Sequence, residues 1–165
     1  MRCERKITVE GYIITTECYI RRGDEILFIH KGGTDMNSGK FLGIGGHFEK
    51  GESPVECIVR EINEETGIKR EELSNLKMRA IITFVNPKYE DEYIYLFEAD
   101  YTGKDDPALR ECDEGELKWV NRKDVFDLPV WEGDKRMFEE MFKDNEFFTM
   151  KLVYDGDELK EAIVD

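Results

Sequence analysis

Residues 46–68 read GHFEKGESPVECIVREINEETGI, which places an arginine and four glutamates at fixed offsets between Gly46 and Gly67. Written as a pattern, the segment is G-x5-E-x7-R-E-U-x-E-E-x-G-U, in which U is an aliphatic residue. With ordinary residue usage of about 6–7% at each fixed position, a chance match is on the order of one in a billion per window. The segment is therefore a specific motif rather than a chance cluster of acidic residues.

The motif predicts one helix with defined ends. Ser53 is expected as the N-cap, Pro54 as the first helical residue and Glu56 as the partner that closes a capping box. Gly67 supplies the left-handed residue that ends a helix. The apolar side chains fall within one arc and should face the core. They are Val55, Ile58, Val59 and Ile62.

A second face of this helix is acidic. Glu61, Glu64 and Glu65 stand at i, i+3 and i+4, so their carboxylates share one side and repel one another. Arg60 is the one nearby cation in the segment. Hard oxygen ligands suit Mg²⁺ or Mn²⁺, so we predict a divalent-cation site here, with Mg²⁺ as the cofactor and Mn²⁺ as an alternative. Cys57 lies on the same face and is expected to be a small packing residue, not a ligand.

A loop with little side-chain bulk precedes the helix. Residues 41–46 read FLGIGG, and their glycines allow the backbone to approach a ligand closely. No Gly-Lys-Ser/Thr follows, and G-x-G-x-x-G is not satisfied, so this loop is neither a P-loop nor a dinucleotide fingerprint.

Composition narrows the class of protein. The 165 residues are 40% hydrophobic and 12% aromatic, which favours a single folded domain spanning residues 1–165. The net charge of −14 argues against polynucleotide binding, which needs clustered basic residues. A phosphate-bearing small molecule would be repelled too, unless bound cations invert the local field. The acidity therefore favours a metal-loaded enzyme that acts on a small molecule.

The location is expected to be cytoplasmic. No signal-peptide pattern is present, and no stretch approaches the roughly 18 apolar residues of a membrane helix. The four cysteines lack C-x-x-C spacing, so free thiols in a reducing compartment are expected for Cys3, Cys18, Cys57 and Cys112. His30 and His47 are not at metal-ligand spacing and are expected to be structural or adjacent to substrate. Monomer and homodimer both stay open.

The remaining pattern predicts mixed strands with helices on both sides, an α/β fold. Strands are predicted at residues 13–21, 26–30, 78–86, 93–101, 117–120, 147–154 and 158–164. A second helix is predicted at residues 134–144, with Met137, Phe138, Met141 and Phe142 as its apolar stripe. Residues 102–116 are predicted to form a long acidic loop.

The motif closely resembles the signature of the Nudix hydrolases. That resemblance implies an α/β/α sandwich with a mixed β-sheet and a metal-assisted attack of water on a nucleoside diphosphate linked to another moiety. The metal ligands it implies are Glu61, Glu64 and Glu65, with a backbone carbonyl near Gly45 or Gly46. Glu52 is implied as the partner of Arg60 in bracing the loop against the helix, or else as a direct metal contact. For the general base it implies Glu64 or Glu65 first and Glu114 second.

Two further segments, residues 39–49 and 118–148, resemble the MutT-like triphosphatases of oxidised nucleotides. The resemblance implies that Trp131 stacks on the base and Asp134 hydrogen-bonds its edge, where the alternatives are a core aromatic and a helix N-cap. Phe41 matches the aromatic before the glycine turn and is counted with the substrate contacts. Leu42 stands where several relatives carry Asn. The cations available for the triphosphate tail are Lys31 and Lys40, and the apolar walls of the pocket, or else core residues, are Ile82 and Phe84.

These observations favour a Mg²⁺-dependent nucleoside triphosphate pyrophosphohydrolase that releases a nucleoside monophosphate and pyrophosphate, with 8-oxo-dGTP-like substrates. Another nucleoside-diphosphate substrate, such as ADP-ribose or a diadenosine polyphosphate, is the alternative within enzymes. A nucleotide sensor without catalysis is the alternative outside them. The presence of all three helix glutamates argues against the sensor.

Overall fold

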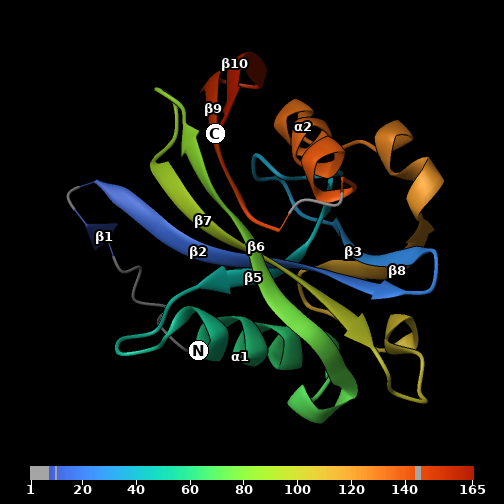
Figure 1. Ribbon diagram of the computed structural model, residues 1–165. Coiled ribbons are helices and arrows are strands. Elements are labelled where there is room, and N and C mark those ends of the chain that lie inside the picture. The colour runs from blue at the N-terminus through green and yellow to red at the C-terminus, as the bar shows by residue number, and fades with distance from the viewer. Residues whose placement is uncertain (1–7, 10, 144–145) are drawn as a thin grey trace.

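The computed structural model describes residues 8–9, 11–143 and 146–165 of the chain (Figure 1). The strands are β1 Thr8–Val9, β2 Tyr12–Arg22, β3 Glu25–Lys31, β4 Phe41–Leu42, β5 Ile44–His47, β6 Leu73–Val85, β7 Asp91–Tyr101, β8 Gly115–Asn121, β9 Phe148–Asp155 and β10 Glu158–Val164. The α-helices are α1 Pro54–Thr66 and α2 Glu132–Met141. Short 3-10 helices occupy Arg70–Glu72, Pro107–Leu109 and Arg122–Asp127.

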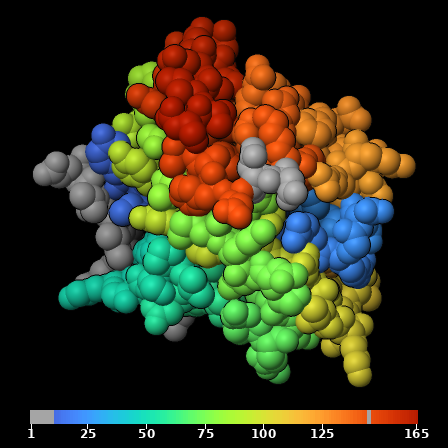
Figure 2. All heavy atoms as spheres, viewed as in Figure 1, coloured from blue at the N-terminus to red at the C-terminus, as the bar shows by residue number. Residues whose placement is uncertain are grey.

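The strands form one mixed sheet whose main path is β10-β9-β6-β7-β2-β3-β4. Off this path, β1 and β5 pair with β2, and β8 pairs with β3. The pairs β2–β7 and β6–β9 are parallel, and the other pairs are antiparallel. Strand β2 is therefore central in the sheet, because it pairs with β7 and also with β3 and β5. In the space-filling view, the β9–β10 hairpin stands at the end opposite α1 (Figure 2).

The two helices cover opposite faces of this sheet (Figure 1). Side chains alternate along β2, so Cys18 and Ile20 join Ile58 of α1 in one buried cluster. Tyr19 points the other way and packs edge-on against Phe138 of α2 in a second cluster. The expectation of an α/β/α sandwich with a mixed sheet is therefore confirmed.

The predicted ends of α1 are confirmed. The Ser53 hydroxyl accepts from the Glu56 backbone N–H at 3.2 Å, and the Glu56 carboxylate accepts from the Ser53 N–H at 2.7 Å. Gly67 has φ 72° and its N–H donates to the Asn63 carbonyl. These contacts fix where the acidic face begins and ends along the chain.

The orientation of α1 differs from the prediction at its first turn. Val55 is 47% exposed, so the expectation that it faces the core is wrong. The buried side of the helix includes Cys57 and Glu61 instead. Cys57 lies with its sulfur 3.3 Å from the Thr16 hydroxyl of β2, which confirms its packing role and turns the acidic face partly toward the sheet.

Other helix and strand boundaries differ from the predicted ones. Helix α2 begins at Glu132, two residues earlier than predicted, because Trp131 has extended dihedral angles and its carbonyl accepts from the Asp134 N–H. Its last regular residue is Met141, and the predicted end at Asp144 lies outside the described residues. Strand β6 begins at Leu73, earlier than predicted. The predicted loop at 102–116 contains a 3-10 turn and the first residues of β8.

In the part of the chain that the structure describes, no helix has the length and apolar character needed to cross a membrane. Within the same residues the free thiols are those of Cys18, Cys57 and Cys112, and Cys3 lies outside them.

Replacing Ser53 with Ala removes the cap that accepts from Glu56. We expect Ser53→Ala to lower the free energy of unfolding by about 1 kcal/mol. Ser53→Gly is the matched control and should lower the free energy of unfolding by only about a few tenths of a kcal/mol, because glycine also suits the N-cap. Urea denaturation followed by circular dichroism measures both. Equal losses in the two variants would contradict a role for the side-chain oxygen.

Candidate active site

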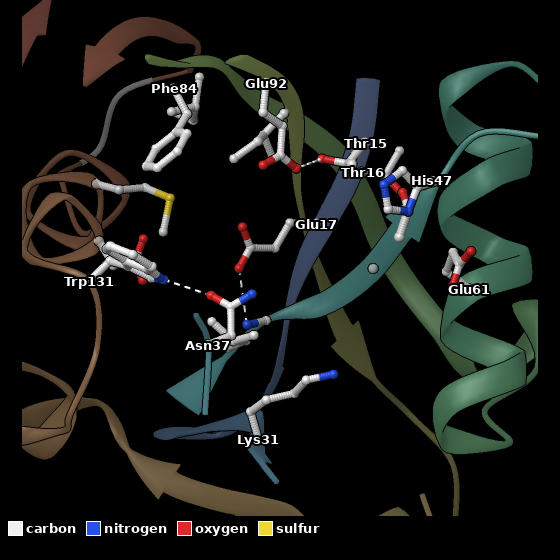
Figure 3. Close-up of a pocket in the computed structure, with 18 of the residues that line it drawn as sticks. Thr15, Thr16, Glu17, Lys31, Asn37, His47, Glu61, Phe84, Glu92 and Trp131 are labelled. Atoms are coloured by element: carbon white, nitrogen blue, oxygen red, sulfur yellow. Dashed lines mark hydrogen bonds between the residues drawn. The ribbon is translucent and has the colours of Figure 1, made fainter. Parts of the chain in front are cut away.

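A cavity of about 320 Å³ extends from the acidic face of α1 to the start of α2. Its charged lining is dominated by carboxylates, and among the described residues Lys31 is the lysine that lines it. The carboxylates belong to Glu17, Glu61, Glu65, Glu92, Glu114 and Asp134. Figure 3 shows α1 on one side of this hollow and the Trp131 side chain on the other. The structure therefore brings together the acidic motif and the segment around Trp131, which are distant in sequence.

Arg60 braces the loop before α1 against the helix. Its Nε and Nη2 donate to the two carboxylate oxygens of Glu52 at 2.5 and 3.0 Å, and Nη2 also donates to the His47 carbonyl at 2.9 Å. Its Nη1 donates to Glu61 at 2.7 Å and to Glu64 at 3.2 Å. The hydrogen bonds from Arg60 hold the pKa of Glu52 below its usual range. Glu52 thus has the bracing geometry, and it does not line the cavity.

Glycines bring the β5 backbone close to the acidic face. Gly45 and Gly46 pair antiparallel with β2, Gly46 opposite Thr16. A Cβ on Gly45 would lie 1.9 Å from the Thr16 carbonyl oxygen, and one on Gly46 would lie 2.6 Å from the Glu61 carboxyl carbon. The Gly45 N–H donates to the Glu65 carboxylate at 3.2 Å. A side chain at Gly45 would therefore clash with β2, and one at Gly46 would clash with Glu61 of α1.

The carboxylates at this end of the cavity lie close enough to affect one another. The pKa of Glu65 is raised to about 9, first by burial and then by the negative charges of Glu61 and Glu114. Among the described residues, no three His, Cys, Asp or Glu side chains are already placed so that they could hold one metal ion. Arg60 donates hydrogen bonds to the carboxylates of Glu61 and Glu64. A hard divalent cation fits this donor set, because it would supply the positive charge that Glu65 lacks.

Glu114 and Lys31 lie at the same end of the cavity as Glu65 of α1. They form an ion pair, and the Gly32 N–H donates to the Glu114 carbonyl. The pairing of β3 with β8 sets Lys31 opposite Gly115, which explains how residue 114 reaches this side. Lys31 and Glu114 therefore both line the cavity, and their roles stay predictions.

The opposite end of the cavity is aromatic. Trp131 is 8% exposed, and its Nε1 donates to the Asn37 side-chain oxygen at 2.8 Å (Figure 3). The rings of Phe84 and Tyr154 pack edge-on against Trp131, with centroids at 6.0 and 5.3 Å. Asp134 lines the same end, in the first turn of α2, and is not the N-cap.

Two predicted substrate contacts lie elsewhere. Phe41 is buried and stacks on His30 with centroids 4.3 Å apart, so it packs in the core, whereas the next residue, Leu42, lines the cavity. The alternation of a strand explains this difference. Lys40 extends to the aromatic end, where its Nζ lies 4.4 Å from the Trp131 ring centroid. The predictions for Phe41 as a substrate contact and for Lys40 at the triphosphate tail are therefore corrected.

The sequence analysis did not identify two partly buried carboxylates in the cavity. Glu17 accepts from the Gly43 N–H at 3.0 Å and from the Tyr19 hydroxyl at 2.9 Å, and burial raises its pKa. Glu92 accepts from the Thr15 hydroxyl at 2.6 Å, and burial raises its pKa too. A single charge within the otherwise uncharged residues 12–20 was the signal for Glu17, because a charge is buried only with a partner or a function.

Comparisons with known proteins agree with this geometry. A family model described as the NUDIX domain matches residues 12–141. The uncharacterized Nudix hydrolase YvcI of Bacillus subtilis (strain 168) is 30% identical over 133 residues, which cover 78% of this chain and 78% of that protein.

Solved structures show the same fold. The crystal structure of the mutator MutT protein from Bacillus halodurans has a TM-score of 0.75 and 27% identity, and the match covers 92% of this chain and 97% of that one. An Ap4A hydrolase from C. elegans has a TM-score of 0.60 at 17% identity, covering 78% of this chain and 94% of that one. The latter likeness shows the fold alone.

Adding a methyl group at Gly46 should disturb the acidic face. The Cβ would lie 2.6 Å from the Glu61 carboxyl carbon, so this carboxylate must move. We expect Gly46→Ala to weaken Mn²⁺ binding at least about tenfold, measured by isothermal titration calorimetry. Gly32→Ala is the matched control, because no atom lies within 4 Å of its Cβ. Equal affinities in the two variants would contradict a cation site at Glu61.

The partly buried Glu17 should make the free energy of unfolding depend on pH. Since burial raises its pKa, the native state keeps a proton that the unfolded chain releases near its ordinary pKa. The stability associated with that proton is present at low pH and is lost as pH rises through the native pKa. We expect the free energy of unfolding of Glu17→Gln to fall less steeply than that of the wild type as pH rises above 4.5, the ordinary pKa of a glutamate. Parallel curves from urea denaturation would contradict this expectation.

Proposed function

The chain belongs to the Nudix hydrolases, and from that premise we propose that it is a Mg²⁺-dependent nucleoside triphosphate pyrophosphohydrolase. The family acts on the pyrophosphate bonds of nucleoside diphosphates linked to another group and generally uses divalent metal ions. The finer proposal is that the products are a nucleoside monophosphate and pyrophosphate. Oxidised purine triphosphates such as 8-oxo-dGTP are the favoured substrates, in the nucleotide pool of the cytoplasm.

One observation carries this proposal. A single cavity joins the acidic face of α1 to an aromatic end that includes Trp131, Phe84 and Tyr154. A nucleoside triphosphate has the same division, with charged phosphates at one end and a flat ring at the other. An aromatic face contributes roughly 1–3 kcal/mol to a stacked base. The likeness to the MutT protein at 27% identity supports the triphosphate over other phosphorylated groups.

The residues that would hold the cation are on α1 and β5. They are Glu61, Glu64 and Glu65, with a backbone carbonyl of Gly45 or Gly46. When bound, a divalent cation would neutralise phosphate charge and lower the pKa of a water molecule. Arg60 positions two of these carboxylates through its Nη1 contacts.

The remaining roles belong to side chains of this chain. In the proposed reaction, water adds to phosphorus, the P–O bond to the pyrophosphate breaks, and a carboxylate takes the proton of the water. Glu64 or Glu65 takes that proton in the leading assignment, and Glu114 is the second candidate. Lys31 lies where its ammonium can pair with a phosphate oxygen, in exchange for Glu114.

A nucleotide panel tests the proposal. The assay follows pyrophosphate and phosphate release from canonical dNTPs, 8-oxo-dGTP, ADP-ribose and diadenosine tetraphosphate, with Mg²⁺ and with EDTA. We expect pyrophosphate from 8-oxo-dGTP in Mg²⁺ and none in EDTA. Preference for ADP-ribose or the dinucleotide would reject the triphosphate assignment. Binding without turnover of any compound would indicate a sensor.

Changing one carboxylate tests the acidic face. Glu64→Gln should lower kcat at least about 100-fold if the carboxylate ligates the cation or takes the proton. Glu71→Gln, at an exposed position in the 3-10 helix after α1, serves as the control. Near-normal turnover of Glu64→Gln would contradict its role as cation ligand or proton acceptor and would move the assignment to Glu65 or Glu114.

A further inference from the structure

Beyond the acidic face of α1, the cavity contains a second group of carboxylates. Glu17 comes from β2, Glu92 from β7 and Asp134 from α2, and all three line the hollow. Figure 3 shows the Glu17 side chain in the middle of the cavity, between Trp131 and Thr15. Nothing in the α1 motif accounts for this group, and the proposed reaction does not use it.

Glu17 is held in one orientation. The Gly43 N–H and the Tyr19 hydroxyl both donate to the same carboxylate oxygen, Oε1, at 3.0 and 2.9 Å. Within the described residues, no protein group donates to the other oxygen, Oε2. This oxygen is also not among the enclosed polar atoms that lack a partner, so it is open to the cavity. One oxygen anchors the side chain, and the other is presented to a ligand.

Glu17 and Asp134 are close enough to interact electrostatically. Burial raises the pKa of Asp134, and the charge of Glu17 raises it further. Glu92 also raises the pKa of Glu17, after burial. The Lys40 ammonium opposes the effect at Asp134. Such a site is stabilised by a ligand that brings hydrogen-bond donors, because the open oxygens then gain partners without a second buried charge.

Purine bases differ in the donors on their edges. A 2-amino-6-oxopurine presents two adjacent donor groups, the ring N1–H and the exocyclic 2-amino group. A 6-oxopurine without that amino group presents N1–H alone, and adenine presents one donor beside an acceptor. Carboxylate oxygens accept and do not donate when ionised. The N–H donors of a bound base favour this ionised form, even though burial raises the pKa of Glu17 in the empty cavity. The lining around Glu17 therefore matches the first kind of base best.

We propose that Glu17 is a specificity-determining residue that, together with Asp134, accepts N–H donors from a 2-amino-6-oxopurine base. The proposal rests on the proposed function, because it places the base of the nucleotide at the aromatic end. It assigns recognition to a residue of the central strand, which lies between the Trp131 end and the acidic face of α1.

Glu17→Gln gives a sharp test. The amide oxygen of the glutamine must face Gly43 and Tyr19 to keep both donors, which turns its NH₂ group toward the cavity. The substitution thus exchanges an acceptor for a donor at the same place and with the same shape. A 2-amino group would then meet a donor instead of an acceptor. Glu158→Gln, on the exposed face of β10, is the matched control.

Binding is measured by calorimetry with dGMP and dIMP in EDTA, which differ only in the 2-amino group. The wild type and Glu158→Gln should bind dGMP about tenfold more tightly than dIMP, within the range expected for one good pair of base contacts. Glu17→Gln should bring the two affinities within about twofold. With dGTP and dITP in Mg²⁺, the loss of discrimination in Glu17→Gln should appear in the ratio of the two KM values more than in the ratio of the two kcat values.

The outcomes separate this proposal from the proposed function. It is overturned if wild-type protein binds dIMP as tightly as dGMP, or binds neither at millimolar concentration. A folded Glu17→Gln protein that keeps the wild-type ratio overturns it as well, and thermal melting reports the folding. Failure to hydrolyse triphosphates would reject the proposed function instead, since the monophosphate measurement needs neither metal nor turnover.

Discussion

The arrangement of the site depends on the guanidinium of Arg60. Its planar fork reaches both oxygens of Glu52, the carbonyl of His47, and the carboxylates of Glu61 and Glu64. A lysine could not make these contacts together, because its ammonium is a single point of charge. The loop before α1, the end of β5 and the acidic face are thus tied to one side chain. Without it, neighbouring carboxylates would repel one another and the loop would lose its register.

The cavity concentrates charge at a cost to stability. Glu17, Glu65, Glu92 and Asp134 all have raised pKa values, and burial is the first cause for each. Groups of this kind destabilise the folded state at neutral pH relative to apolar residues. Elsewhere, buried charge is neutralised within the protein, as where Arg79 donates to Glu98 at 2.6 Å. Among the described residues, the carboxylates with raised pKa values therefore line the cavity in which we propose a cation and a base as their partners.

Local patterns predicted the acidic helix well because its ends depend on neighbours in the chain. The Ser53 cap, the Glu56 capping box and the Gly67 ending are contacts over three or four residues. The outward turn of Val55 could not be seen in the same way, since it depends on how Cys57 meets Thr16 of β2. Helical periodicity identifies an apolar arc but does not decide which edge of that arc meets the sheet.

The sequence by itself determined the Nudix motif, the α/β class and the side chains of the acidic face, because each is encoded within a short window. Only the tertiary structure decided that Glu17 shares a cavity with Asp134, and that Phe41 turns into the core while Lys40 lies over Trp131. These positions follow from the pairing of β2 with β5 and β7 and from the docking of α2. Contacts between such distant segments depend on strand register and helix packing, which no local pattern encodes.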